Sequence, residues 1–261
     1  MNRYQPLPLL EARRLTLHIG SRVICRQLDL SVAAGESLAI LGRNGAGKST
    51  LLSALAGLLP ACSGDVLLDG QAYAALSARE AACKRGWMAQ VQADAFTSSV
   101  LETALTGRHP HLGRWDWESA VDADLARQSL AAVGLEGMEE RETPTLSGGE
   151  RQRLSIATLL TQAPRLYLLD EPLAHLDLAH QITVLELFTR LAQEQGAGVV
   201  QVLHDPSLAA RYCDRALLLH GDGSWEAGPQ AEILTAPALS RLYGYPLREI
   251  TDSGQRWFVP A

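Results

Sequence analysis

The sequence predicts an α/β fold in which a largely parallel sheet carries an N-terminal antiparallel β subdomain and an inserted helical subdomain. In the second half of the chain, short apolar runs at 165–170 and 198–205 flank a helical pattern at 179–195, as in parallel strands joined by helices. Alternating apolar and polar residues near the N-terminus are typical of antiparallel strands. From about Thr97 to Met138 the pattern is helical instead, which indicates the insertion.

The individual elements follow from the period of the apolar residues. Alternation at 11–20 and 22–32, on either side of Gly20 and Ser21, predicts an antiparallel pair of strands. Further strands are expected at 37–42, 64–73, 165–170, 198–205, 215–220 and 255–260. Helices are expected at 47–59, 98–107, 120–135, 148–163, 179–195, 206–213 and 237–244.

Composition and charge narrow the class of protein. With 261 residues and 47% apolar content, the chain is able to bury a full core. Its net charge of −6 argues against a protein that coats nucleic acid, so no nucleic-acid partner is expected. The longest charge-free stretch, 49–64, is shorter than the roughly 18 to 20 apolar residues that span a bilayer, so we expect no membrane-crossing segment. The widely spaced Cys25, Cys62, Cys83 and Cys213 are expected to be reduced cytosolic thiols.

A glycine-rich stretch at 41–50, LGRNGAGKST, has the spacing G-x-x-x-x-G-K-[ST] of a phosphate-binding loop. It lies between an expected strand and an expected helix, whose first N–H groups favour an anion at the loop. Lys48 is expected to reach the β and γ phosphates of a nucleotide, and the Ser49 hydroxyl to bind Mg²⁺. The expected nucleotide-binding residues are Gly42, Arg43, Asn44, Gly45, Ala46, Gly47, Lys48, Ser49 and Thr50. The alternative is a glycine turn beside a surface lysine.

Two adjacent carboxylates, Asp170 and Glu171, lie at the carboxyl end of a hydrophobic strand, where ligands bind in open parallel sheets. Adjacent strand residues face opposite ways, so the two side chains are able to take different roles. Asp170 is expected to organise Mg²⁺ through Ser49 or water. Glu171 is expected to orient and deprotonate the water that attacks the γ phosphate. The alternative is that both residues only cap the strand before Pro172.

The stretch TLSGGERQRLSIA begins another expected helix. Ser147 followed three residues later by Glu150 is a capping box. Two glycines in the first helical turn weaken a helix by about 1 kcal/mol each relative to alanine, which suggests that something must approach this turn closely. An amide-rich helix start is a second candidate anion site. The two phosphate-binding elements must then either converge in one site or meet across two copies of the chain.

Five motifs, GRNGAGKST, LSGGERQR, YLLDEP, LDLAHQ and VLHD, occur in an order and spacing that resemble the nucleotide-binding subunit of an ABC transporter. The resemblance extends from about residue 10 to 245, and LSGGE is its specific element. In that family two subunits pair head to tail, and each ATP lies between one phosphate loop and the signature helix of the other subunit. The resemblance therefore implies a homodimer in which Ser147, Gly148 and Gly149 contact the γ phosphate bound on the partner chain.

Other roles are implied where residues match the family motifs. Gln90 resembles the glutamine that touches Mg²⁺ or the attacking water, and His204 the switch histidine that contacts the γ phosphate. Asp177 resembles the loop residue that communicates across the dimer. The sequence departs from the family where an aromatic residue usually stacks on adenine, because His18 and Ile19 occupy the nearest positions. Arg43 of the phosphate loop stands where many relatives have proline.

The stretch 105–115, LTGRHPHLGRW, lies in the region that docks membrane subunits in the family. It resembles importers of iron-siderophores, haem and cobalamin, with cobalamin the closest resemblance. The implied protein is an ATPase that uses ATP and Mg²⁺, lies peripherally on the cytoplasmic face of the inner membrane, and energises two transmembrane permease subunits. A substrate-binding protein would be an indirect partner. The alternatives are a haem importer ATPase, an exporter half, and a soluble scaffold of the iron-sulfur-assembly type.

The expected organisation is a single nucleotide-binding domain over residues 1–261. Its ATPase core and β subdomain are expected at 1–96 and 151–235, the helical subdomain with the signature motif at 97–150, and a C-terminal tail at 236–261.

Overall fold

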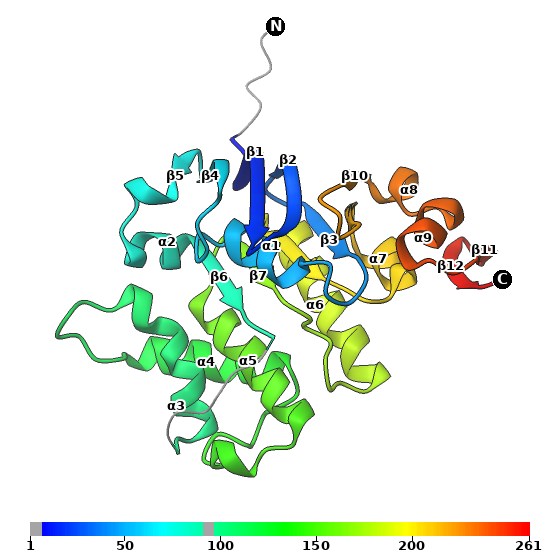
Figure 1. The fold of residues 1–261 in the computed structure, drawn as a ribbon. Coiled ribbons are helices and arrows are strands. Elements are labelled where there is room, and N and C mark those ends of the chain that lie inside the picture. Colours follow the sequence, from blue (N-terminus) through cyan, green and yellow to red (C-terminus); the bar gives the residue numbers. More distant parts are fainter. Residues whose placement is uncertain (1–6, 91–96) are drawn as a thin grey trace, which may run out of the picture.

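The computed structural model of this chain describes residues 7–90 and 97–261 (Figure 1). Its centre is a six-stranded sheet of order β10-β9-β3-β8-β7-β6. The strands are β3 (Ser37–Leu41), β6 (Arg85–Met88), β7 (Leu166–Leu169), β8 (Gly198–Val202), β9 (Arg215–Leu219) and β10 (Trp225–Pro229). All neighbours pair in parallel except β10, which is antiparallel to β9. The predicted parallel sheet is confirmed.

A second sheet, of order β2-β1-β4-β5, is antiparallel throughout. It consists of β1 (Leu10–Ile19), β2 (Arg22–Val32), β4 (Ser63–Leu68) and β5 (Gln71–Ala72). The predicted N-terminal β subdomain is therefore confirmed. Gly64 allows β4 to approach β1, because a Cβ at this position would lie 2.3 Å from the Arg14 carbonyl oxygen.

Helix α1 (Lys48–Leu55) packs between the two sheets. Its buried Leu51, Leu52 and Leu55 share one apolar cluster with residues from both sheets, such as Leu17 of β1 and Ile40 of β3. The predicted helix 47–59 is longer than the observed one, because Gly57 at φ +70 takes the left-handed conformation that ends helices. This packing holds the start of α1 at the end of the loop that follows β3.

The remaining helices of the core, and the tail, follow the expected order. They are α6 (Leu178–Gln195), α7 (Pro206–Tyr212), α8 (Gln230–Ile233) and α9 (Ala236–Tyr243), and the chain ends in a hairpin of β11 (Leu247–Asp252) and β12 (Gln255–Pro260). In Figure 1 these last elements, orange to red, lie at the right, away from the green helical subdomain at the lower left.

The helical subdomain contains α3 (Val100–Leu105), the 3₁₀ segment η2 (Thr106–His111), α4 (Ala120–Ala132), η3 (Thr143–Thr145) and α5 (Gly148–Gln162). Helices α3, α4 and α5 each begin with a capping box, at Ser99, Ser119 and Ser147. One apolar cluster runs from Val100 of α3 through α5 to Phe188 of α6. The subdomain is therefore packed against the parallel sheet through α5.

Three further elements, namely η1 (Tyr73–Ala75), α2 (Ala78–Lys84) and β6, lie between β5 and the helical subdomain. The sequence analysis predicted none of these, nor α8 and β11. The four cysteines are free. In the part of the chain that the structure describes, no helix combines the length and apolar character needed to cross a membrane.

Candidate nucleotide-binding site

The loop between β3 and α1 surrounds an open pocket of about 470 Å³. Gly45 and Gly47 have φ values of 78° and 99°, which residues with a Cβ rarely adopt. Gly42 must also lack a side chain, because its Cβ would lie 2.6 Å from the Leu219 carbonyl oxygen. The loop is thus a curled backbone of the kind whose N–H groups bind an anion, with the Ala46 N–H donating to the Arg43 carbonyl oxygen at 3.0 Å within the loop.

Lys48, the first residue of α1, is only 5% exposed. Its Nζ donates hydrogen bonds to the carbonyl oxygens of Gly42 at 3.0 Å and Arg43 at 3.2 Å. Burial lowers the pKa of Lys48, and the carboxylates of Glu171 and Asp170 oppose that effect. The Lys48 ammonium group is therefore held against the phosphate loop, near enough to the carboxylates of Glu171 and Asp170 to interact with their charges.

Asp170 directly follows β7 and is 3% exposed. Burial raises its pKa, against a lowering hydrogen bond with Ser49. Its Oδ1 atom has no hydrogen-bond partner among the described residues. A buried carboxylate oxygen without a partner, beside a serine hydroxyl, matches the oxygen ligands that Mg²⁺ prefers. The chemistry of the two residues therefore fits the ion.

The carboxylate of Glu171 contacts the side chains of His204 and Gln90, which were also predicted to be catalytic. Its Oε1 lies 2.8 Å from Nε2 of His204, and its Oε2 accepts a hydrogen bond from Nε2 of Gln90 at 3.0 Å. All three residues line the pocket, together with Lys48 and Ser49. Residues from the ends of β6, β7 and β8 are thus brought together at one edge of the parallel sheet, as predicted.

Other predicted residues lie elsewhere in the chain. Ser147 and Gly148 are exposed at the start of α5 and do not line the pocket of Lys48. Gly149 faces the loop before α6, because its Cβ would lie 3.0 Å from the His175 carbonyl oxygen. Asp177 caps α6 by accepting the His180 N–H at 2.9 Å, and hydrogen bonds from His180 lower the pKa of its carboxyl. A single chain does not bring these residues to its own pocket.

Of the predicted nucleotide-binding residues of the phosphate loop, Asn44, Gly45, Gly47, Ser49 and Thr50 line the pocket, as Lys48 does. Gly42 and Arg43 instead line a neighbouring cavity of about 320 Å³, beside His204 and Tyr243. Ala46 is buried.

Residues of the β subdomain also line the pocket. Ile19 of β1, one of the two positions expected near adenine, lines it, whereas His18 does not. Arg22 and Ile24 of β2 line it as well and were not predicted. The Arg22 guanidinium donates to the Gly221 carbonyl oxygen at 3.4 Å. Alternation predicted these strands, but how they pack over the loop decides which residues face the pocket.

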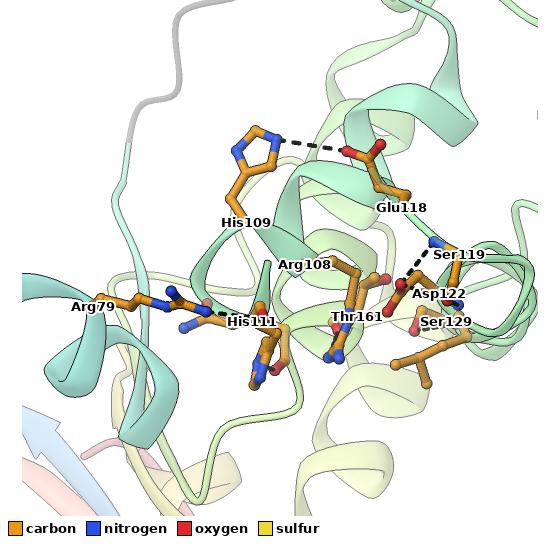
Figure 2. Close-up of polar contacts among 11 residues, drawn as sticks. Arg79, Arg108, His109, His111, Glu118, Ser119, Asp122, Ser129 and Thr161 are labelled. Atoms are coloured by element: carbon orange, nitrogen blue, oxygen red, sulfur yellow. Dashed lines mark hydrogen bonds and ion pairs between the residues drawn. The ribbon is translucent and has the colours of Figure 1, made fainter. Parts of the chain in front are cut away.

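The stretch 105–115 is largely occupied by contacts within the chain (Figure 2). Arg108 pairs with Asp122, their Nε and Oδ1 atoms being 2.7 Å apart. Nε2 of His111 lies 2.8 Å from the Gln162 carbonyl oxygen of α5, and Arg79 of α2 donates to the Pro110 carbonyl oxygen at 2.8 Å. The loop after η2, which begins inside this stretch, is different, because the side chains of Trp115 and Trp117 are exposed there.

The site has a phosphate loop between a parallel strand and a helix. After a second strand it has an aspartate suited to bind Mg²⁺, followed by a glutamate. These features define a phosphate-loop nucleoside triphosphatase. A family model described as ABC transporter matches residues 25–174. The chain belongs to the ABC transporter family, and it is an ATPase.

Several named proteins are similar over most of their length. The chain is 40% identical to the Hemin import ATP-binding protein HmuV of Burkholderia thailandensis, over 94% of this chain and 96% of that protein. It is 44% identical to HmuV of Gloeobacter violaceus, over 90% and 87% respectively. Among solved structures, a chain described as a metal-chelate type ABC transporter in an inward-facing conformation is 30% identical, with a TM-score of 0.84, covering 97% of this chain and 98% of that one. A dimeric ATP-binding cassette bound to ADP and Pi is 25% identical, with a TM-score of 0.73, covering 85% and 98%.

Proposed function

We propose that this ATPase energises an ABC importer, in which two copies close on ATP and move two transmembrane permease subunits. The observation that carries the proposal is the placement of Glu171 between His204 and Gln90, at the edge of the pocket that holds Lys48. Such a carboxylate is suited to orient a water molecule for attack on a γ phosphate and to accept its proton. Its two partners limit the directions in which the carboxylate is able to rotate.

Each residue of the pocket has a separate task in this proposal. Lys48 balances the charge of the β and γ phosphates, and the loop N–H groups fix their position. Asp170 and Ser49 would hold Mg²⁺, which when bound neutralises charge on the phosphate oxygens. His204 contacts the γ phosphate and keeps Glu171 oriented toward the attacking water. Gln90 responds to the same phosphate from the segment that leads into the helical subdomain.

The second copy supplies what the pocket lacks. The Ser147 Oγ accepts the Glu150 N–H as a helix cap, and the Ser147 hydroxyl also hydrogen-bonds with the Glu150 carboxylate, so the phosphate would be met mainly by backbone donors. The first backbone N–H groups of α5 have no partner within the helix. These donors suit the γ phosphate of an ATP bound by the partner copy, with Asp177 on the loop between the two sites. Of the similar structures, the cassette bound to ADP and Pi is a dimer.

In this proposal the base of ATP lies against the residues that the β subdomain contributes to the pocket. Ile19 and Ile24 offer aliphatic surface there, and the planar guanidinium of Arg22 is able to stack on a purine. This arrangement would replace the aromatic residue that the family usually provides.

The exposed loop after η2 is the proposed contact with a permease subunit. Arg114 lies over the ring of Trp115 at 5.7 Å, and Trp117 is exposed beside it. Exposed tryptophans are uncommon on a monomer surface and frequent in interfaces. Two permease subunits would place the ATPase peripherally on the cytoplasmic face of the inner membrane, with a substrate-binding protein as an indirect partner.

Haem, cobalamin and ferric siderophores are the candidate cargoes. The names of the similar proteins favour haem, whereas the sequence resemblance favours cobalamin. The decisive experiment purifies the chain with its permease and measures uptake of each labelled cargo into proteoliposomes, with a Glu171→Gln complex as control. ATP-dependent uptake of one cargo supports the proposal. Outward transport would indicate an exporter half, and isolation without any permease would indicate a soluble scaffold ATPase.

A further inference from the structure

The C-terminal tail contacts the segment that carries His204 from two sides. At the end of α9, the Tyr243 hydroxyl donates a hydrogen bond to the His204 carbonyl oxygen at 3.4 Å. In β12, the backbone N–H of Phe258 donates to Oγ of Ser207 at 3.1 Å. Ser207 lies in the first turn of α7, which begins directly after His204 and its capping neighbour Asp205.

The tail is itself rigidly packed, so these contacts hold a fixed position. Leu239 and Leu242 of α9 are buried in one apolar cluster with Leu203, the residue before His204. Phe258 is buried in the same cluster. The bend from α9 to β11 is closed by the Leu247 N–H, which donates to Oγ of Ser240 at 2.8 Å.

The same helix end also lies beside the phosphate loop. Gly244 ends α9 in a left-handed conformation, with φ +69, and an Arg43 nitrogen lies 3.6 Å from where a Cβ on Gly244 would be. Arg43, His204 and Tyr243 line one cavity of about 320 Å³. The end of α9 therefore stands between the phosphate loop and the loop that carries the switch histidine.

The His204 side chain needs external support, because half of it is exposed and it lies two residues beyond Val202, the last residue of β8. Directly after β8, the Leu203 N–H donates a hydrogen bond to the Ile40 carbonyl oxygen at 3.1 Å. The peptide group between His204 and Asp205, which follows the His204 ring along the chain, is contacted from outside the sheet by the Tyr243 hydroxyl. Burial raises the pKa of Tyr243 to about 12, so its hydroxyl remains a donor at any physiological pH.

We propose that Tyr243 is a positioning residue for ATP hydrolysis, which fixes the His204 backbone so that its ring stays against Glu171. The inference rests on the proposed function, in which His204 and Glu171 act on the γ phosphate. The C-terminal tail thereby contributes to ATP hydrolysis, although its residues do not line the nucleotide pocket.

The test is Tyr243→Phe in the full chain, which removes one oxygen atom and keeps the ring. Tyr245→Phe is the matched control, because that tyrosine is 54% exposed and lies two residues further along. We expect Tyr243→Phe to lower kcat for ATP hydrolysis about three- to tenfold, with KM for ATP unchanged within about twofold. The control should match the wild type in both constants.

A second readout separates positioning from a general loss of stability. With ring-labelled histidine, the His204 NMR signal is identified as the one absent from His204→Gln. Tyr243→Phe should shift this signal and leave those of the other six histidines in place. Unchanged kcat together with an unmoved His204 signal overturns the inference, as does a loss of kcat that follows a lowered unfolding midpoint without that shift. If the wild-type chain hydrolyses no ATP, the proposed function fails, and the NMR result still decides whether Tyr243 positions His204.

Discussion

Asp122→Asn should destabilise the helical subdomain in a pH-dependent way. The carboxylate of Asp122 accepts hydrogen bonds from the Ser119 N–H at 2.9 Å, the Ser119 hydroxyl at 2.7 Å and Nε of Arg108 at 2.7 Å (Figure 2). These contacts, the backbone hydrogen bond above all, lower the pKa of Asp122 from 3.8 to about 2. Its side chain is 14% exposed, so solvent screens the contacts in part. At pH 7 we expect the substitution to cost about 1–2 kcal/mol.

The sign of the pH dependence follows from the direction of the shift. A carboxyl whose pKa is lower in the folded state stabilises the fold above its ordinary pKa, and that contribution is lost as pH falls through the folded-state value. The difference between wild type and variant should therefore shrink between about pH 5 and pH 2, with about half remaining near pH 3.

The assay is urea unfolding followed by far-UV circular dichroism at pH 7, 4 and 3. Asp124→Asn is the matched control, because Asp124 is 68% exposed and pairs only with Arg127 three residues on, at 3.0 Å. It should change the free energy of unfolding by less than about 0.5 kcal/mol at every pH. Equal losses in the two variants, or a loss in Asp122→Asn that does not depend on pH, would refute the reasoning.

Four further predictions concern the pocket. Lys48→Ala should abolish measurable ATP binding by calorimetry, and wild-type affinity would contradict the phosphate-loop assignment. Glu171→Gln should keep ATP affinity, lose at least about a hundredfold in turnover and accumulate dimer with ATP in gel filtration, whereas unchanged turnover would exclude Glu171 as the base. Mixing Ser147→Arg with Lys48→Ala subunits should restore about one working site per heterodimer, and inactivity of the mixture would contradict sites shared between chains. Arg22→Gln should weaken ATP about five- to tenfold and leave tripolyphosphate affinity unchanged, unless Arg22 contacts phosphate instead of the base.

The phosphate loop and the acidic strand end were predictable because their signals are local. The glycine spacing around Lys48 and the apolar run before Asp170 each occupy a few consecutive residues. The structure adds why the glycines are needed, since Gly47 faces Ile24 of β2, whose Cδ1 would lie 2.6 Å from a Cβ on Gly47. A local sequence pattern is sufficient to predict a structural feature when a single segment of the chain forms that feature.

Features that depend on packing between distant segments were not predictable from local patterns. Arg22 and Ile24 reach the pocket only because the β subdomain folds over the loop. The meeting of Gln90 and His204 at Glu171 was expected from family resemblance, and spacing along the chain does not imply it. Strand β6 was missed because four residues are too few to show a period.

Helix α2 was missed for a different reason. Its capping box, Ser77 with Glu80, is present in the sequence, but the seven residues that follow bury only Ala81 and show no apolar stripe. The helix is held instead by tertiary contacts, such as the hydrogen bond from Arg79 to the Pro110 carbonyl oxygen. A capping box that is not followed by an apolar face is therefore insufficient to predict a helix that is held by contacts with other elements.

Helix α5 links the two functional ends of the chain mechanically. Ser147 begins the helix, and Gln152, five residues on, is buried and donates from Nε2 to the carbonyl oxygens of Glu171 at 3.1 Å and Pro172 at 3.0 Å. Glu171 has φ 52, a left-handed conformation that is unfavourable for a residue with a Cβ and persists only where its surroundings hold it. We therefore expect a ligand that displaces the start of α5 to act through Gln152 on the backbone of the proposed base. In the proposed head-to-tail dimer, the glutamate of one site would then respond to the ATP that occupies the other.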